Sequence, residues 1–437
     1  MTYCSCVTGR WAQGSDVKPS VDNNVIIVGA GLAGLACARR LTQDNVPFQI
    51  LEADHQIGGR LKTENVDGFL LNYGFQVLQT AYPEARQALD YDRLELMPFA
   101  PGAMIRIDDR FFRIADPRRC PRDLFSTLKA PIGTMADRLR ILQLAREVRQ
   151  TAVADIFHLP DMPTTEFLRV KGFSEKIIQR FFKPFFAGVC LDPEIGASSR
   201  VFRYIFRVFA EGDVALPSQG MRAIAEQLTE NLPDERIRTG TTVQSIAEGE
   251  VILESGERLT SPAVVLATEG PETARLLGTP ESVASRGELC LYFCAKEPPI
   301  AEPYLILNGN ATGWVNSVTI PSNVAPSYAP DDLSLVSVVV IGHLDTDYST
   351  AETVVRRELT GWFGPVVDEW QHLKTYHIVH ALPEQSPPMP DPTVSSASGK
   401  PGIYVCGEHG SVPGIQWALL SGRQTAKQII KDLKNEV

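Results

Sequence analysis

The first strongly patterned segment of the chain is a strand–helix–strand unit near its N-terminus. Val25–Val28 is a short apolar run in front of a glycine-rich turn, which predicts a buried parallel strand. Apolar residues then recur at helical spacing over Leu32–Gln43, and a second apolar run ends at Glu52. This order predicts a βαβ unit whose turn lies between the first strand and the helix.

The rest of the chain alternates between helical and strand-rich blocks. From Pro121 to Ala210 the spacing predicts helices at Thr134–Ala152, Thr165–Val170, Ser174–Phe182 and Ser198–Phe209. A helix at Met221–Glu230 is followed by short strands up to residue 268, and a second strand-rich block covers residues 289–380. The last block predicts a strand at Gly402–Cys406 and a helix over most of Pro413–Asp432. Nucleotide-type βα elements therefore recur at the start, middle and end, which indicates two interleaved domains.

Composition narrows the class of protein. The 437 residues are 44% hydrophobic and 22% charged, as in folded globular proteins, and the net charge of −10 argues against nucleic-acid binding. The eight cysteines form no CxxC pair, and no His, Cys, Asp or Glu cluster has metal spacing, so we expect reduced thiols and no metal. No transmembrane or secretory segment is evident. We expect a cytoplasmic protein, or a plastid stromal one if a transit peptide has been removed.

The glycines after the first strand carry the first chemical prediction. Gly29 permits a tight turn, Gly31 lets the backbone approach a pyrophosphate, and Gly34 lets the helix pack against the strand. The pyrophosphate would lie at the helix N-terminus, where free N–H groups favour anions. Glu52 ends the next strand, at the usual place for a carboxylate that binds both ribose hydroxyls. The motif therefore predicts a dinucleotide with an unphosphorylated adenosine ribose.

The chain also resembles the flavin-dependent amine oxidase and phytoene desaturase superfamily. Four stretches carry the resemblance: Gly29–Gly34, Glu52–Arg60, Thr242–Thr268 and Tyr404–Gly422. The resemblance implies non-covalent FAD, with the late Gly407-Glu408 turn against the ribityl–phosphate arm. The cofactor-binding residues that it implies are Gly29, Ala30, Gly31, Leu32, Ala33, Gly34, Glu52, Ala53, Gly59, Arg60, Gly74, Phe75, Gln76, Val243, Thr268, Gly407, Glu408, Ile415, Gln416 and Ala418.

Together these observations predict an α/β fold in which a Rossmann-like, three-layer FAD-binding domain is interleaved with a substrate domain. We expect residues 1–22 to be a tail, residues 23–105, 215–285 and 395–437 to form the FAD-binding domain, and residues 106–214 and 286–394 to form the substrate domain. The substrate domain would combine a helical insert with a mixed sheet.

The substrate class is predicted from positions at which this chain differs from the pattern of the amine oxidases that it resembles. Many amine oxidases keep a lysine near flavin N5, but Cys290 falls at that place here and Lys296 falls at the far end of the strand. The segments around Gln76 and Phe181–Cys190 are similar to the desaturase, carotene isomerase and hydroxysqualene dehydroxylase side of the superfamily. We therefore expect a hydrophobic, isoprenoid-like or carotenoid-like substrate, with O₂ or a quinone-type acceptor reoxidising the flavin.

Five side chains are candidates for tuning the reaction beside the flavin: Gln76, Cys290, Tyr292, His409 and Trp417. Direct hydride transfer needs little acid–base machinery, so these residues would mainly position the substrate and exclude water. Core packing is the alternative for Tyr292 and Trp417, and a loop histidine bonded to backbone is the alternative for His409.

Three alternatives remain for the protein as a whole: an amine or amino-acid oxidase, a non-catalytic flavin-binding scaffold or chaperone, and a NAD-linked dehydrogenase.

A further feature is the arginine stripe Arg200, Arg203 and Arg207 on an aromatic helix. It predicts either peripheral membrane contact, with the arginines at headgroup level, or a core helix with one cationic edge.

Overall fold

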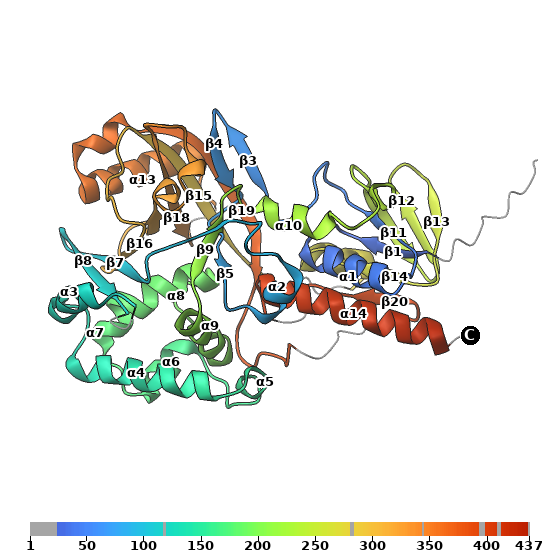
Figure 1. The fold of residues 1–437 in the computed structure, drawn as a ribbon, viewed down its shortest axis with the longest axis horizontal. Coiled ribbons are helices and arrows are strands. Elements are labelled where there is room, and N and C mark those ends of the chain that lie inside the picture. The colour runs from blue at the N-terminus through green and yellow to red at the C-terminus, as the bar shows by residue number, and fades with distance from the viewer. Residues whose placement is uncertain are drawn as a thin grey trace, which may run out of the picture.

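The computed structural model describes residues 24–116, 119–279, 284–342, 345–392, 398–408 and 412–435. The predicted tail 1–22 and His409 lie outside these residues. Figure 1 shows two lobes, one built on a parallel sheet and one on a larger mixed sheet, with the chain crossing between them several times.

The first lobe is centred on a five-stranded parallel sheet. Its strands, in spatial order, are β10 (Ile237–Arg238), β2 (Phe48–Leu51), β1 (Val25–Val28), β14 (Val264–Leu266) and β20 (Ile403–Val405). All four pairings are parallel. The predicted βαβ unit is therefore confirmed, and segments from the start, middle and end of the chain meet in one sheet.

Alternation along β1 explains why this lobe has three layers. Val25 and Ile27 pack on one face with α1 (Leu32–Gln43), α10 (Arg222–Thr229) and α14 (Ile415–Asn435). Ile26 and Val28 pack on the other face against a three-stranded antiparallel sheet. Successive strand residues point to opposite faces, so an unbroken apolar run requires cover on both sides. The antiparallel strands are β11 (Val243–Ala247), β12 (Glu250–Leu253) and β13 (Arg258–Thr260).

The second lobe is built on a seven-stranded mixed sheet. In spatial order its strands are β19 (Gln371–Pro383), β15 (Ser285–Ala295), β18 (Ser334–Ile341), β17 (Val315–Thr319), β16 (Leu305–Asn308), β7 (Gly102–Ile107) and β8 (Arg110–Ala115). The pair β16–β7 is parallel and the other pairs are antiparallel. We expected the first segment of the FAD-binding domain to end at residue 105. This boundary falls inside β7, and the whole of that strand pairs in the second sheet.

Helices cover both faces of the mixed sheet. One face packs against α13 (Tyr348–Phe363). The other packs against the helical insert, whose helices are α4 (Met135–Gln150), α6 (Thr164–Val170), α7 (Glu175–Ile177), α8 (Lys183–Cys190) and α9 (Ser199–Glu211). The helix predicted at Ser174–Phe182 forms but is neither regular nor complete: α7 passes into a π-helical turn at Ile178–Phe182, and the helical path continues as α8. Pro184 lies in the first turn of α8, where a proline is tolerated, so the chain does not stop there.

The remaining elements are short and link the two lobes or cover their edges. Strands β3 (Thr63–Val66) and β4 (Phe69–Asn72) form a hairpin, and β5 (Leu78–Gln79), β6 (Leu96–Pro98) and β9 (Val214–Pro217) form a small sheet. The other helices are α2 (Pro83–Ala88), α3 (Leu124–Lys129), α5 (Val153–Ile156), α11 (Gly270–Leu277) and α12 (Pro321–Val324). Among the described residues, no helix combines the length and apolar character that crossing a bilayer requires.

Candidate FAD and substrate cavity

One large cavity of about 1030 Å³ runs from the parallel sheet into the mixed sheet. This volume is at the upper end of the range for ligand pockets, so the cavity can hold a long ligand with a second molecule beside it. One end is lined by glycine turns and charged residues of the first lobe. The other end, called here the apolar arm, is lined by Phe185, Val189, Leu191, Ile205, Phe209, Leu305, Leu307, Val339 and Ile378.

The polar end begins at the turn between β1 and α1. Gly29 has φ +104°, and a Cβ there would lie 2.8 Å from the carbonyl oxygen of Ala267. At Gly31, by contrast, a Cβ would meet no atom closer than 4.0 Å, so the backbone is open on the cavity side. The first turn of α1 has neither a side-chain cap nor an acidic residue. Its N–H groups are therefore available to an anion such as a pyrophosphate.

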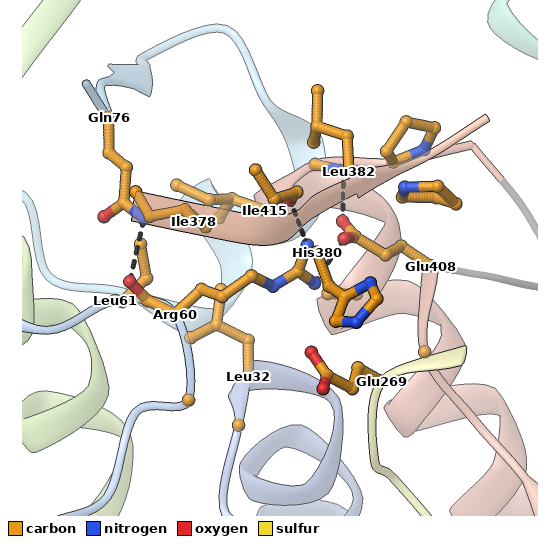
Figure 2. A pocket seen from close by; sticks show the side chains of 18 of the residues that line it. Leu32, Arg60, Leu61, Gln76, Glu269, Ile378, His380, Leu382, Glu408 and Ile415 are labelled. Carbon is orange, nitrogen blue, oxygen red and sulfur yellow. Dashed lines mark hydrogen bonds and ion pairs between the residues drawn. The ribbon is translucent and has the colours of Figure 1, made fainter. Parts of the chain in front are cut away.

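Charged side chains define the rest of the polar end (Figure 2). Glu52 accepts hydrogen bonds from the N–H groups of Ala30 at 2.6 Å and Asp54 at 2.9 Å, which fixes its carboxylate beside the glycine turn. Arg60 forms an ion pair with Glu408, and it also donates to the carbonyl oxygen of Ala381. The late Gly-Glu turn and the early Gly-Gly-Arg turn thus meet in space, although they are far apart in the chain.

Most of the predicted cofactor-binding residues line this cavity. They are Gly29, Gly31, Leu32, Ala33, Glu52, Ala53, Gly59, Arg60, Phe75, Gln76, Val243, Thr268, Gly407, Glu408, Ile415 and Ala418. Ala30, Gly34, Gly74 and Gln416 are outside the lining. Gln416 is buried and its Oε1 accepts a hydrogen bond from the N–H of Glu84 at 2.8 Å, so its side chain points towards α2.

The four predicted catalytic side chains that the structure describes divide into one at the cavity and three that are not in its lining. Gln76 lines the cavity, and its Nε2 donates to the carbonyl oxygen of Arg60 at 2.8 Å. Cys290 and Tyr292 are buried behind the lining, where Tyr292 Oη donates to the carbonyl oxygen of Asn72 at 2.9 Å. Trp417 is buried against Phe157. We therefore assign no direct catalytic role to Cys290, Tyr292 or Trp417, because the core packing considered as their alternative accounts for their positions.

Sequence reasoning missed several polar residues of the cavity. Gln79 and Glu288 are 4% and 6% exposed, and both line it. Neither belongs to a motif, because Gln79 lies on a two-residue strand and Glu288 lies in an otherwise apolar one. The period-two pattern of β15 places Glu288 on the same face as Cys290 and Tyr292, and this was the available signal.

The arginine stripe on α9 faces the protein and not the solvent. Arg203 is 8% exposed, and its guanidinium lies 4.2 Å from the centre of the Phe167 ring. Arg200 donates to the carbonyl oxygens of Leu159 at 2.7 Å and Met389 at 2.9 Å. Arg207 donates to carbonyl oxygens of α4 and the residue that follows it. Of the two alternatives for this stripe, the structure favours the core helix over arginines at headgroup level, because all three arginines donate to backbone carbonyl oxygens of the described chain.

Comparison with known proteins agrees with this geometry. The sequence profile of the family described as flavin containing amine oxidoreductase matches residues 32–430. A putrescine oxidase from Kocuria rosea is 36% identical over 18% of this chain and 16% of its own length. A 4,4'-diapophytoene desaturase from Methylomonas sp. is 33% identical over 20% of this chain and 18% of its own length. The chain thus matches less than a fifth of the length of either relative.

Solved structures show the same fold over almost the whole chain. An oxidoreductase from Methanosarcina mazei superimposes with a TM-score of 0.69 at 16% identity, covering 93% of this chain and 100% of the other. The fold is therefore one that solved structures share over almost the whole length of this chain.

The residues of the polar end fit FAD. The uncapped N-terminus of α1 suits a pyrophosphate, and the buried Oε1 of Gln76 has no hydrogen-bond partner among the residues that the structure describes. A ligand in the cavity can satisfy that atom, which would otherwise be costly to bury. When bound, FAD would supply a two-electron hydride acceptor. The family match, the fold and the fit of the cavity lead to one conclusion: the chain belongs to the flavin-containing amine oxidoreductase family and is an FAD-dependent oxidoreductase.

Proposed function

We propose that this oxidoreductase removes hydride from a C–H bond of a lipophilic, isoprenoid-like or carotenoid-like small molecule. The observation that carries the proposal is the apolar arm, in which aromatic and aliphatic side chains of α8, α9, β16 and β18 surround the space beyond the polar end. Such a lining favours an apolar substrate, whose burial is driven by the hydrophobic effect. O₂ or a quinone-type acceptor would reoxidise the cofactor.

Two further observations support a lipophilic substrate over an amine. Lys296 is the residue that follows β15, the strand on which we expected the lysine of an amine oxidase; its side chain is 84% exposed and pairs with Glu369 at 3.4 Å. It is not among the residues that line the cavity. The similarity to a diapophytoene desaturase also agrees with an isoprenoid-like substrate.

An amine or amino-acid oxidase is the second candidate, favoured by the similarity to a putrescine oxidase. The cavity contains a carboxyl group near the arm, Glu288, that could pair with an ammonium group. In an amine oxidase Glu288 would bind the ammonium group of the substrate, whereas a lipophilic substrate offers it no such partner. Substrate affinity can therefore distinguish the two candidates.

We also propose peripheral contact with an anionic membrane, through α3 and α4 in place of α9. Phe125 on α3 is 71% exposed, and Met135 and Leu139 on α4 are 63% and 60% exposed. Leu124, Leu128 and Leu142 on the same two helices are exposed as well. Residues 119–150 contain seven Arg or Lys and three Asp or Glu, in a chain of net charge −10. Figure 1 places both helices at the end of the molecule opposite the parallel sheet. Exposed apolar residues flanked by cations suit a surface of anionic lipids.

Flotation with vesicles tests the membrane contact. We expect the protein to float with phosphatidylglycerol–phosphatidylcholine vesicles, and the double variant Phe125→Asp/Leu139→Asp to stay in the soluble fraction. Val366→Asp is the matched control, since Val366 is an exposed apolar residue (46%) on another helix. Equal flotation of the double variant, or equal binding to pure phosphatidylcholine, would contradict the proposal. We expect such contact to be reversible in a cytoplasmic or stromal protein. The buried cysteines among the described residues are free thiols, which agrees with a reducing compartment.

Anaerobic absorbance spectroscopy tests the substrate class. We expect the purified protein to carry FAD, and a lipid extract to bleach its visible absorbance while a panel of amines does not. Bleaching by amines alone would favour the second candidate. A flavin that dithionite bleaches but neither panel reduces would favour a non-catalytic flavin-binding scaffold.

A further inference from the structure

Glu288 is an ionisable side chain enclosed in the middle of the cavity lining. It lies on β15, where its cross-strand neighbours are Ile341 on β18 and Ile378 on β19. The residue is 6% exposed and lines the cavity that contains both the polar end and the apolar arm. A carboxyl group buried among aliphatic neighbours is costly to retain, so its presence calls for a chemical explanation.

The carboxyl group is held in place at one oxygen and is free at the other. Glu288 Oε1 accepts a hydrogen bond from the N–H of Phe75 at 3.1 Å. A Cβ on Gly74 would lie 2.3 Å from the same Oε1, so glycine is required beside the carboxyl group. Within the part of the chain that the structure describes, Oε2 has no hydrogen-bond partner and no cation pairs with the group.

The loop that holds Glu288 is itself fixed to β15. Tyr292 Oη donates to the carbonyl oxygens of Asn72 at 2.9 Å and Gly74 at 3.4 Å. Tyr292 therefore positions the loop that passes from β4 to Gln76, and the loop in turn positions Glu288. The buried tyrosine that sequence analysis proposed as catalytic acts here as a positioning residue.

We propose that Glu288 is a catalytic base, which accepts at Oε2 the proton that leaves the substrate during oxidation. This inference rests on the proposed function. In the dehydrogenation of two neighbouring carbon atoms to a C=C bond, each carbon loses one hydrogen. One hydrogen leaves as hydride to the two-electron acceptor that FAD would supply. The other leaves as a proton to Oε2, and the electron pair of its C–H bond becomes the π bond. Glu288 ends the step as a neutral carboxylic acid, which its apolar surroundings favour.

The ionisation of Glu288 agrees with this role. Burial raises the pKa of its carboxyl group to about 7, against the effect of the Phe75 hydrogen bond, which lowers it. On the same face of β15 lie the Cys290 thiol, whose pKa burial raises to about 12, and the Tyr292 phenol, whose pKa burial raises further. β19 contributes the Tyr376 phenol, whose pKa burial also raises, and His380, which lines the cavity and lies 2.6 Å from Ser285 Oγ through its Nδ1. The thiol and both phenols are neutral near pH 7, and the direct cross-strand neighbours of Glu288, Ile341 and Ile378, are aliphatic. A base whose pKa lies near the working pH is efficient in proton transfer.

Infrared titration of the FAD-loaded protein without substrate provides the first test. We expect the carbonyl band of a protonated carboxyl group to disappear as the pH rises through about 7 in the wild type. The band should be missing in Glu288→Gln and unchanged in Glu358→Gln. Glu358 is the matched control because it is partly buried, accepts the N–H groups of Trp314 and Val315, and does not line the cavity. A band that survives in Glu288→Gln overturns the proposal.

Anaerobic flavin bleaching by the lipophilic substrate provides the second test. We expect Glu288→Gln to keep its FAD but to bleach roughly 10²- to 10⁴-fold more slowly, and to lose the rise of the rate with pH. A wild-type rate in this variant overturns the proposal. So does a variant affected only in its affinity for amines, which would make Glu288 an ammonium anchor.

Failure of the proposed function can be distinguished from failure of this inference. If no lipid bleaches the wild type, the substrate class is wrong, and the infrared titration alone decides whether Glu288 exchanges a proton in the cavity. If Glu288→Gln does not fold, Glu288→Asp replaces it. A carboxyl group drawn back by one methylene should keep the infrared band and slow the bleaching roughly 10- to 100-fold, and an unchanged rate contradicts the role.

Discussion

The two ends of the cavity are built in different ways. The polar end is made of turns that are continuous in the chain, such as Gly29–Gly34 and Gly58–Arg60, and its contacts are largely backbone groups and fixed charges. The apolar arm is made of single side chains from two helices and several strands of another lobe. Figure 1 shows how far these elements lie apart along the chain before they converge.

This difference explains why the two ends tolerate change differently. At Gly29, Gly34 and Gly58 a Cβ would lie within 3 Å of a backbone oxygen, so the polar end depends on glycines at these positions. The apolar arm depends on volume and polarity, and both can change while the fold is kept. We therefore expect the polar end to fix the cofactor and the apolar arm to set the substrate.

The largest effect is expected from Gly34→Val. A Cβ at this position would lie 2.1 Å from the carbonyl oxygen of Gly29, so α1 cannot stay against the turn. We expect a loss of roughly 3 kcal/mol in the free energy of unfolding and loss of bound FAD, measured by urea denaturation and by flavin absorbance. Gly361→Ala is the control, because no atom lies within 4 Å of a Cβ there. Full FAD content in Gly34→Val would contradict the view that the polar end depends on its glycines to hold the cofactor.

The second effect is the dependence of stability on pH through Glu288. Its pKa is raised on folding to about 7, so its stabilising contribution is complete below the pKa of the unfolded chain and is lost as the pH rises towards 7 and above. Glu288→Gln should therefore unfold at similar urea concentrations to the wild type near pH 4.5, but gain about 3 kcal/mol at pH 8. A wild-type pH profile in the variant would show that the carboxyl group is not buried as described.

The third effect concerns Glu52, the residue of the polar end that the sequence motif predicts to bind the adenosine ribose. Glu52→Gln loses charge on the group that accepts hydrogen bonds from Ala30 and Asp54. We expect FAD affinity to fall by about 2 kcal/mol, roughly 30-fold, measured by fluorescence titration of the apoprotein. Glu250→Gln is the control, since Glu250 pairs with Arg258 outside the cavity. Unchanged affinity in Glu52→Gln would remove this residue from the cofactor site.

The smallest effect is expected in the apolar arm. Val189→Trp fills part of the arm, so the KM for the lipophilic substrate should rise about tenfold, equivalent to 1.4 kcal/mol, while FAD content is unchanged. Val170→Trp is the control, because Val170 is 68% exposed and outside the cavity. A loss of FAD in Val189→Trp would show that the two ends are not independent.

Local rules were enough to predict much of the first lobe. The helix Leu32–Gln43 has the predicted bounds, and most motif residues that the resemblance named line the cavity. The catalytic set could not be found in the same way. Tyr292 and Trp417 have the residue types of a flavin site, but burial behind the lining depends on which strand or helix packs over them. The two alternatives for the arginine stripe on α9 could not be separated from the sequence for the same reason, since its backbone acceptors lie on other segments.

The sequence by itself determined the βαβ unit, the glycine turns and the dinucleotide end of the cavity, because these depend on backbone geometry and on residues close together in the chain. Only the tertiary structure decided which side chains face the substrate. Glu288 became a candidate because the loop after β4 and the strands β15, β18 and β19 surround it, and no cation among the described residues pairs with it. No local pattern encodes the absence of a partner. Burial and pairing are properties of the assembled chain, and in this protein they select the group that we propose exchanges a proton with the substrate.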